Sequence, residues 1–449
     1  MKFEFLPVDL QFADLRDLVS LLQVSRYFHD TFNFSSNNNL YSNLFANYFD
    51  ITAPLRRFNL LSSNIALELR QRMVTLDRFH ARLRNDILDD AHLLVDLLRL
   101  YLIAIESDYT NTRYSSLISL YSRRFIHSAA FPSPDDHLNS FILWLDYLYN
   151  DNPPEITPYK PFLFAAHHYD SFYAPWPYAK LPSAEFDAQF DDPFLTNLTL
   201  HDQSITITYF GTTMRFRPPL SSHAAFLTLH KYKNNLSKPR LTSKDFDAEF
   251  VRLTHCTDPS SSPGCSKTLF KNHFQGAWEG FFSYYEFDDY RDILAGSVDT
   301  LYNGVYAMQP QVWRLNEVMQ EYKPSTSLST LSDVCGNPQE QHLFLKQQDT
   351  TSVNDTPPIN DILIQSDTMD EDKEIGLSGL GHSSWGRFTL RGKVRAWDGM
   401  FMLCKEYTPD RRGKWFYRGY SLPGGVLVGR WRDTYTRLLC VDEALKSKC

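Results

Sequence analysis

The spacing of apolar residues changes from a helical period in the first third of the chain to a two-residue period near its C-terminus. Between residues 93 and 105, apolar side chains recur at helical spacing in a broad stripe. From residue 388 to 396, Phe, Leu, Val and Ala alternate with Thr, Arg and Lys, which makes one face of a strand apolar and the other basic. Because the two periods occupy separate stretches, we expect a fold of the α+β class.

Several helices are predicted between residues 56 and 150. Asp89 and Asp90 precede the stripe that starts at Leu93, and acidic residues favour the N-terminus of a helix. A shorter helix carries Leu117, Leu120 and Tyr121, and a third runs from about residue 138 to 148. These apolar faces are most simply the core of a small bundle, so we assign them no cofactor.

The C-terminal strands are predicted to pair through tight turns. Asp398-Gly399 is a hairpin turn between residues 388–396 and 400–403, and a second pair flanks residues 423–425. A further hairpin is expected over residues 204–217, turning at Gly211. Short strands joined in this way indicate an antiparallel meander, and closing the sheet into a β-barrel would remove its edges.

Length and net charge limit the classes of protein to which the chain can belong. A chain of 449 residues is too long for a single core, so we expect two or three domains. A net charge of −8 and a pI near 6.0 give no electrostatic reason to propose nucleic acid. The sequence shows neither a secretory leader nor an apolar run that could span a bilayer. We therefore expect a soluble protein of the cytoplasm, the nucleus or both, with no membrane partner.

The sequence carries no recognisable catalytic constellation. His167 and His168 are adjacent but lack an Asp, Ser or Cys at a known spacing, which favours packed or surface histidines. Cys256 and Cys265, with His255, could be half of a zinc site, although no second ligand pair follows and reduced thiols are the simpler interpretation. A hydrolase would need a nucleophile elbow or paired carboxylates. We expect a non-enzymatic protein without metal or cofactor.

The N-terminal stretch carries the first resemblance. Leu6-Pro7-Val8-Asp9-Leu10 is followed by an apolar helical pattern from Asp17 to Asp30 and by an aromatic segment at residues 40–50. This order resembles an F-box, the helical module that joins a substrate receptor to a Skp–cullin ubiquitin ligase. F-box sequences have a further apolar helical turn after this Leu-Pro segment. Here only residues 11–14 occupy that place, so the module is shortened. The alternative is the first helix of an ordinary helical domain.

The resemblance implies a surface for the Skp adaptor and, through it, for cullin. The residues expected to form this surface are apolar or aromatic and come from the first 28 positions. They are Leu6, Pro7, Leu10, Leu15, Leu18, Leu21, Leu22, Val24 and Phe28.

A second signature lies in the C-terminal half. Residues 276–285 set Trp278 between two glycines and add alternating rings, and motifs rich in Trp, Gly and Arg follow at 385–388, 394–399, 413–420 and 429–434. Together they resemble large F-box proteins of basidiomycete fungi, whose C-terminal half is similar to the lipocalin-like barrel of the human F-box protein thirty-one type. The family has a further closing strand where residues 437–449 are polar.

The resemblance implies that this barrel binds a protein substrate. The candidate contacts combine aromatic rings with guanidinium groups, which suit carboxylate, amide or phosphate groups. They are Trp278, Arg395, Trp397, Trp415, Arg430 and Trp431. The alternative is that most of these tryptophans fill the core of a small barrel.

The predicted organisation follows from these signatures. The ranges are a shortened F-box-like module at 1–52, a helical linker bundle at 53–150, an aromatic and proline-rich strap with a hairpin at 151–265, barrel parts at 266–323 and 381–436, a disordered acidic insertion at 324–380 and a tail at 437–449. The expected function is substrate recognition in a Skp–cullin–F-box ubiquitin ligase. The alternative is a lipocalin-like module that binds a small ligand or a protein without a ligase role.

Overall fold

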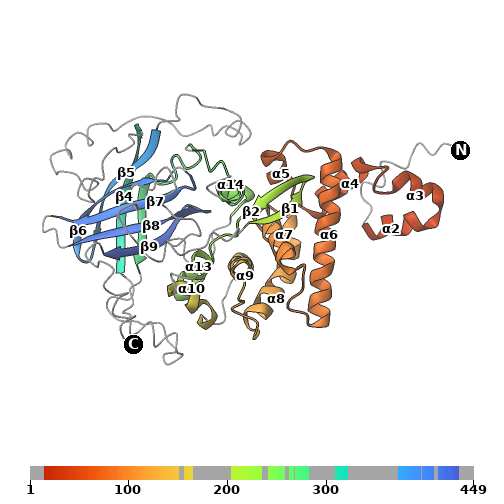
Figure 1. The fold of residues 1–449 in the computed structure, drawn as a ribbon, viewed down its shortest axis with the longest axis horizontal. Coiled ribbons are helices and arrows are strands. Elements are labelled where there is room, and N and C mark those ends of the chain that lie inside the picture. The colour runs from red at the N-terminus through yellow and green to blue at the C-terminus, as the bar shows by residue number, and fades with distance from the viewer. Residues whose placement is uncertain are drawn as a thin grey trace. The chain divides into compact units, whose positions relative to one another are not determined.

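The fold was analysed in a computed structural model (Figure 1). It describes residues 15–150, 156–164, 204–234, 241–257, 262–266, 268–282, 309–321, 373–395, 397–408 and 413–433. The chain forms two compact units. A helical unit combines Met1–Pro158 with Ser204–Thr254, and a sheet unit combines Tyr159–Gln203 with His255–Cys449. The α+β class is therefore confirmed.

Most of the helical unit is built from helices in chain order. They are α2 (Leu15–Val24), α3 (Arg26–Phe32), α4 (Asn38–Tyr48), α5 (Thr52–Arg57), α6 (Ser62–Asn85), α7 (Leu93–Ile105), the 3-10 turn η2 (Thr110–Tyr114), α8 (Ser115–Ile126) and α9 (Asp136–Tyr149). The predicted helices around residues 93–105, 117–121 and 138–148 are thus confirmed as α7, α8 and α9. A short turn η3 (Thr157–Tyr159) follows, and helix α10 (Lys160–Phe164) falls within the sheet unit.

The segment 204–254 completes the helical unit. The predicted hairpin is confirmed as β1 (Ile205–Tyr209) and β2 (Thr212–Phe216), which pair antiparallel. Three helical segments that the sequence analysis did not anticipate come next: α13 (Ser221–Asn234), η6 (Ser243–Phe246) and α14 (Asp247–His255). α13 packs against α9, where the Trp144 indole N–H donates to the Leu220 carbonyl at 2.9 Å.

The N-terminal apolar stretch forms two helices, not the single one expected between Leu18 and Phe28. α2 ends at Val24, and Ser25 takes an extended conformation before α3. Its side-chain oxygen accepts the Phe28 backbone N–H at 3.3 Å, as an N-cap residue does. A serine inside an apolar helical pattern can start a new helix, and this one turns the chain.

The sheet unit contains seven antiparallel strands that pair in sequence order. They are β3 (Gly276–Phe282), β4 (Gln309–Glu321), β5 (Lys373–Ser383), β6 (Gly386–Val394), β7 (Met400–Tyr407), β8 (Lys414–Leu422) and β9 (Val426–Asp433). The predicted meander and its turns after residues 394 and 422 are confirmed. Strands β3 and β9 are the sheet edges, and they do not pair with each other within the described residues.

Strand β5 begins inside the range predicted to be a disordered insertion. Ile375 and Leu377 are buried and lie on the same face as Gly379 and Gly381, so residues from 373 onward belong to the sheet. A Cβ atom at Gly381 would come within 2.3 Å of the Phe388 ring, so a larger residue would not fit at this position of β5. The predicted contacts Leu6, Pro7 and Leu10, residues 324–372, His167, His168 and the tail 437–449 lie outside the described residues.

Alternation along the strands separates two faces of this sheet. In β6 the apolar residues Phe388, Leu390 and Val394 are buried, whereas Arg387 is exposed and Lys393 is half-buried, as predicted for that strand. The register places Phe388 opposite Tyr407. We call the side of the sheet that carries Phe388 the inner face.

Candidate functional site

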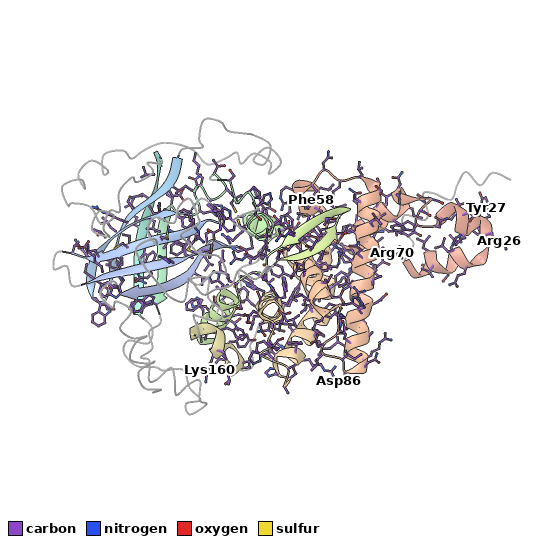
Figure 2. The ribbon with its side chains drawn as sticks, viewed as in Figure 1. Arg26, Tyr27, Phe58, Arg70, Asp86 and Lys160 are labelled. Carbon is purple, nitrogen blue, oxygen red and sulfur yellow. The ribbon has the colours of Figure 1, made fainter. Side chains whose placement is uncertain are left out.

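Helices α2 and α3 present apolar side chains to solvent. Val19, Val24 and Tyr27 are 53%, 68% and 64% exposed, although the sequence places them in an otherwise apolar pattern. Figure 2 shows Tyr27, next to Arg26, on α3. On the same helix, the ring of Phe28 stacks on that of the buried Phe32, with centroids 6.1 Å apart. Within the described residues, the two helices therefore expose apolar side chains, which often mark a protein–protein contact when they form a patch.

The predicted adaptor contacts divide between this surface and the core. Leu18 is buried, Leu21, Leu22 and Phe28 are half-buried, and Val24 is exposed. Leu15 begins α2, and its side chain lies outside the described residues. Sequence analysis missed Val19 and Tyr27. Their apolar character was visible in the sequence, but the break at Ser25 that orients α3 was not.

The sheet curls, so that strands far apart in the sheet order meet on the inner face. Trp313 on β4 lies edge-on to Tyr417 on β8, with ring centroids 5.3 Å apart. Phe282 on β3 meets Trp431 on β9 at 5.4 Å. Because β3 and β9 are the opposite edges of the sheet, this contact requires strong curvature.

Lys405 lies on the inner face, where it pairs with Leu390 on one side and Trp415 on the other. Its Nζ donates to the Gln311 side-chain oxygen at 3.1 Å, which links β7 to β4 across the curl. It also lies 4.0 Å from the centroid of the Phe388 ring and 4.8 Å from that of Tyr407. The rings of Phe282 and Trp415 are 5.8 and 6.0 Å away. A lysine that is 2% exposed is thus held by rings and one amide oxygen.

This environment favours the neutral amine. Burial lowers the pKa of Lys405 from 10.5 to about 7, and within the described residues no carboxylate forms a salt bridge with it. Burial also raises the pKa of Tyr417, a shift that its hydrogen bond with Gln311 opposes. Near neutral pH, Lys405 is therefore a hydrogen-bond donor in an apolar setting, suited to an oxygen acceptor attached to an apolar group.

We expect Lys405→Met to remove much of the pH dependence of the sheet unit's stability. Between pH 7 and 10.5 the unfolded chain binds more protons than the folded one at this site, so the free energy of unfolding rises with pH. For a pKa lowered this far, the rise is on the order of 3 kcal/mol. Urea unfolding followed by tryptophan fluorescence at pH 7 and pH 10 measures it.

The matched control for this prediction is Lys271→Met, at an exposed position ahead of β3. That variant should keep the wild-type pH dependence, because Lys271 is exposed and the Lys405 side chain is unchanged. Equal pH dependence in Lys405→Met and in the wild type would contradict the assignment of a shifted pKa to Lys405.

Three of the six predicted substrate contacts lie on the inner face. Trp415 packs on Tyr407 at 5.2 Å, and Trp431 contacts Phe282. Trp278 pairs directly with Trp313 in the register of β3 and β4, and its indole N–H donates to the Phe274 carbonyl at 2.8 Å. All three tryptophans are half-buried, so their rings can both support the sheet and contact a ligand.

Arg395 and Trp397 lie in the buried turn between β6 and β7. Arg395 is fully buried and donates to both carboxylate oxygens of Asp398, at 2.7 and 2.5 Å. The Tyr420 hydroxyl donates to Asp398 at 2.6 Å, from the face of β8 opposite Tyr417. This geometry gives Arg395 a role in holding the turn, away from the inner face. The Arg430 backbone pairs with that of Arg418, and its side chain lies outside the described residues.

Lys405 and Gln311 were not among the residues predicted from the sequence. In β7 the inward positions are Phe401, Leu403, Lys405 and Tyr407, so a charged residue interrupts an apolar alternation. That interruption was a usable signal, because a charge at a core position is rarely tolerated without a partner. The partner, Gln311, is 94 residues away in the sequence.

Within the described ranges, no cluster of three or more His, Cys, Asp or Glu side chains could hold a metal ion. None of the described helices combines the length and apolar character needed to cross a bilayer.

In comparisons with known proteins, no protein-family model, no curated protein and no solved structure matches this chain.

Proposed function

We propose that the chain is the substrate-recognition subunit of a Skp–cullin–F-box ubiquitin ligase. In this proposal α2 and α3 bind the Skp adaptor, which in turn binds cullin. The observation that carries it is the exposure of Val19, Val24 and Tyr27, all more than half exposed on two adjoining helices. These residues fall within the stretch that resembles an F-box, and burying such a surface against a partner is favourable.

The sheet unit would bind the target protein. Its inner face offers half-buried indole rings and the donor Lys405, which together suit an apolar side chain next to an oxygen acceptor. The meeting of Phe282 with Trp431 supports the lipocalin-like part of the proposal, because side chains from both sheet edges already touch. Closure into a full barrel would further require backbone pairing that joins β3 to β9, directly or through another segment.

The proposed mechanism is proximity. A receptor that holds a target beside a ubiquitin-charged enzyme raises the effective concentration of the target's lysines, and the receptor itself performs no bond-making step. The two units then have separate tasks, docking and target binding. A substitution that weakens adaptor docking should leave target binding intact, and a substitution that weakens target binding should leave docking intact.

The second candidate is a binding module without a ligase role. The observation that favours it is Lys405, since a buried amine surrounded by four rings resembles the polar anchor of a small-ligand site. Both candidates use the inner face, but only the first requires the α2–α3 surface. Adaptor binding therefore separates them.

We expect the double variant Val24→Asp/Tyr27→Asp to retain less than about one tenth of the adaptor binding of the wild type, since each carboxylate would be desolvated in the contact. The measurement is a pull-down of a purified Skp adaptor by the full chain. The matched control is Leu120→Asp on α8, where Leu120 is 58% exposed in the same unit. Equal capture by both variants would count against the docking role of α2 and α3.

A further inference from the structure

The sulfur atoms of Cys256 and Cys265 lie close together in the sheet unit. Their Sγ atoms are 3.3 Å apart, although the residues are nine positions apart in the chain. Both side chains are buried and both are thiols. The Gly264 backbone N–H donates to the His255 carbonyl at 2.9 Å. The backbone therefore already brings together the two ends of the loop that separates these cysteines.

A single carbonyl fixes both cysteines. The Trp397 carbonyl accepts the Cys265 backbone N–H at 2.7 Å and the Cys256 thiol at 2.9 Å. Gly264 has φ of +77°, and a Cβ atom there would lie 2.5 Å from the Trp397 ring, so glycine is needed for this approach. The two thiols are thus held side by side by contacts that do not depend on a bond between them.

We propose that Cys256 and Cys265 are a modification site, at which a small disulfide such as oxidised glutathione converts the thiol pair reversibly to an intrachain disulfide. A sulfur–sulfur bond of about 2.05 Å requires the sulfurs to approach by little more than 1 Å. Side-chain rotation can supply that movement, because the loop ends are already in place. This inference is independent of the proposed ligase role.

The chemistry balances in two exchange steps. The thiolate of Cys265, the more exposed of the two at 8%, attacks oxidised glutathione and releases one glutathione thiolate. The thiolate of Cys256 then attacks the Cys265 sulfur of the mixed disulfide and releases the second glutathione. Two electrons and two protons pass from the cysteine pair to the oxidant, which becomes two glutathione molecules. Excess reduced glutathione reverses both steps.

The test uses the wild-type full chain and needs no substitution for its main readout. Cleavage after Arg252 and Lys267 by trypsin leaves both cysteines in one peptide, residues 253–267, whereas Cys404 falls in another. After incubation with oxidised glutathione, free thiols are alkylated, and the mass of peptide 253–267 is measured by mass spectrometry. We expect it to escape alkylation and to lose about 2 Da, the mass of the two hydrogens removed. Dithiothreitol before alkylation should restore two alkyl groups.

Two further outcomes decide the proposal. Cys256→Ser should turn the intrapeptide disulfide into a stable glutathione adduct on Cys265, and Cys404→Ser should leave the disulfide unchanged. The proposal is overturned if peptide 253–267 of the wild type stays fully alkylated, if it carries only glutathione adducts, or if either cysteine instead joins a cysteine of another peptide. A failure here would leave the adaptor-binding test unaffected.

Discussion

Replacing Arg72 by methionine is expected to lower the free energy of unfolding of the helical unit by about 3–5 kcal/mol. Arg72 is 1% exposed, and it donates to Glu68 at 3.0 Å and to Glu106 at 2.7 Å. Burial lowers the pKa of Arg72, but the two carboxylates more than offset this and raise it, so the guanidinium stays charged. Methionine would fill the space and leave Glu106, which is fully buried, without this ion-pair partner.

The measurement for Arg72 is urea unfolding followed by far-UV circular dichroism, which reports mainly on helices. Arg70→Met is the matched control, because Arg70 is exposed on the same helix, α6 (Figure 2). It should change the free energy of unfolding by less than about 0.5 kcal/mol. Similar losses in the two variants would show that burial of the ion pairs does not set the stability of this unit.

Asp398→Ala is expected to cost the sheet unit about 3–5 kcal/mol. It would remove the Asp398 carboxylate from the fully buried Arg395 and would also remove an acceptor of the Tyr420 hydroxyl. The Asp398 carboxylate further accepts the Met400 backbone N–H at 3.2 Å, where β7 begins. The turn between β6 and β7 would thus lose the group that organises it, close to the strand that carries Lys405.

Tryptophan fluorescence during urea unfolding measures the loss in Asp398→Ala. The control is Glu279→Ala, which removes an exposed carboxylate from β3 in the same unit and should have little effect. If the urea midpoint of Asp398→Ala is close to that of the wild type, Arg395 is not needed to hold the turn and would be a candidate for ligand binding. A large loss would support the structural role that its geometry indicates.

Local patterns predicted the elements of this fold well. The helical stripe that forms α7 and the alternation in β6 depend on neighbours within a few positions, and so do the Asp398-Gly399 turn and the hairpin at Gly211. β5 was missed over residues 373–380 because glycines occupy two of its inner positions and an acidic run precedes it. Its role is visible only beside β6, where the Phe388 ring occupies the space over Gly381.

The candidate site was predicted only in part, because it depends on the curl of the sheet. Three tryptophans could be chosen from their motifs, yet Lys405 and Gln311 meet only when β4 and β7 face each other. Arg395 was assigned to a ligand because a guanidinium beside rings suits binding. Its partner Asp398, three positions away, was already assigned to a turn, and a buried Arg–Asp pair within that turn was not considered.

A calorimetric titration of the full chain with a purified Skp adaptor tests the proposed receptor role. We expect a one-to-one complex with a dissociation constant of about 1 µM or tighter. The Val24→Asp/Tyr27→Asp variant should lose it, while Lys405→Met should retain it. Absence of binding at about 100 µM wild-type chain, with both units folded, would contradict the proposed receptor role and favour a stand-alone binding module.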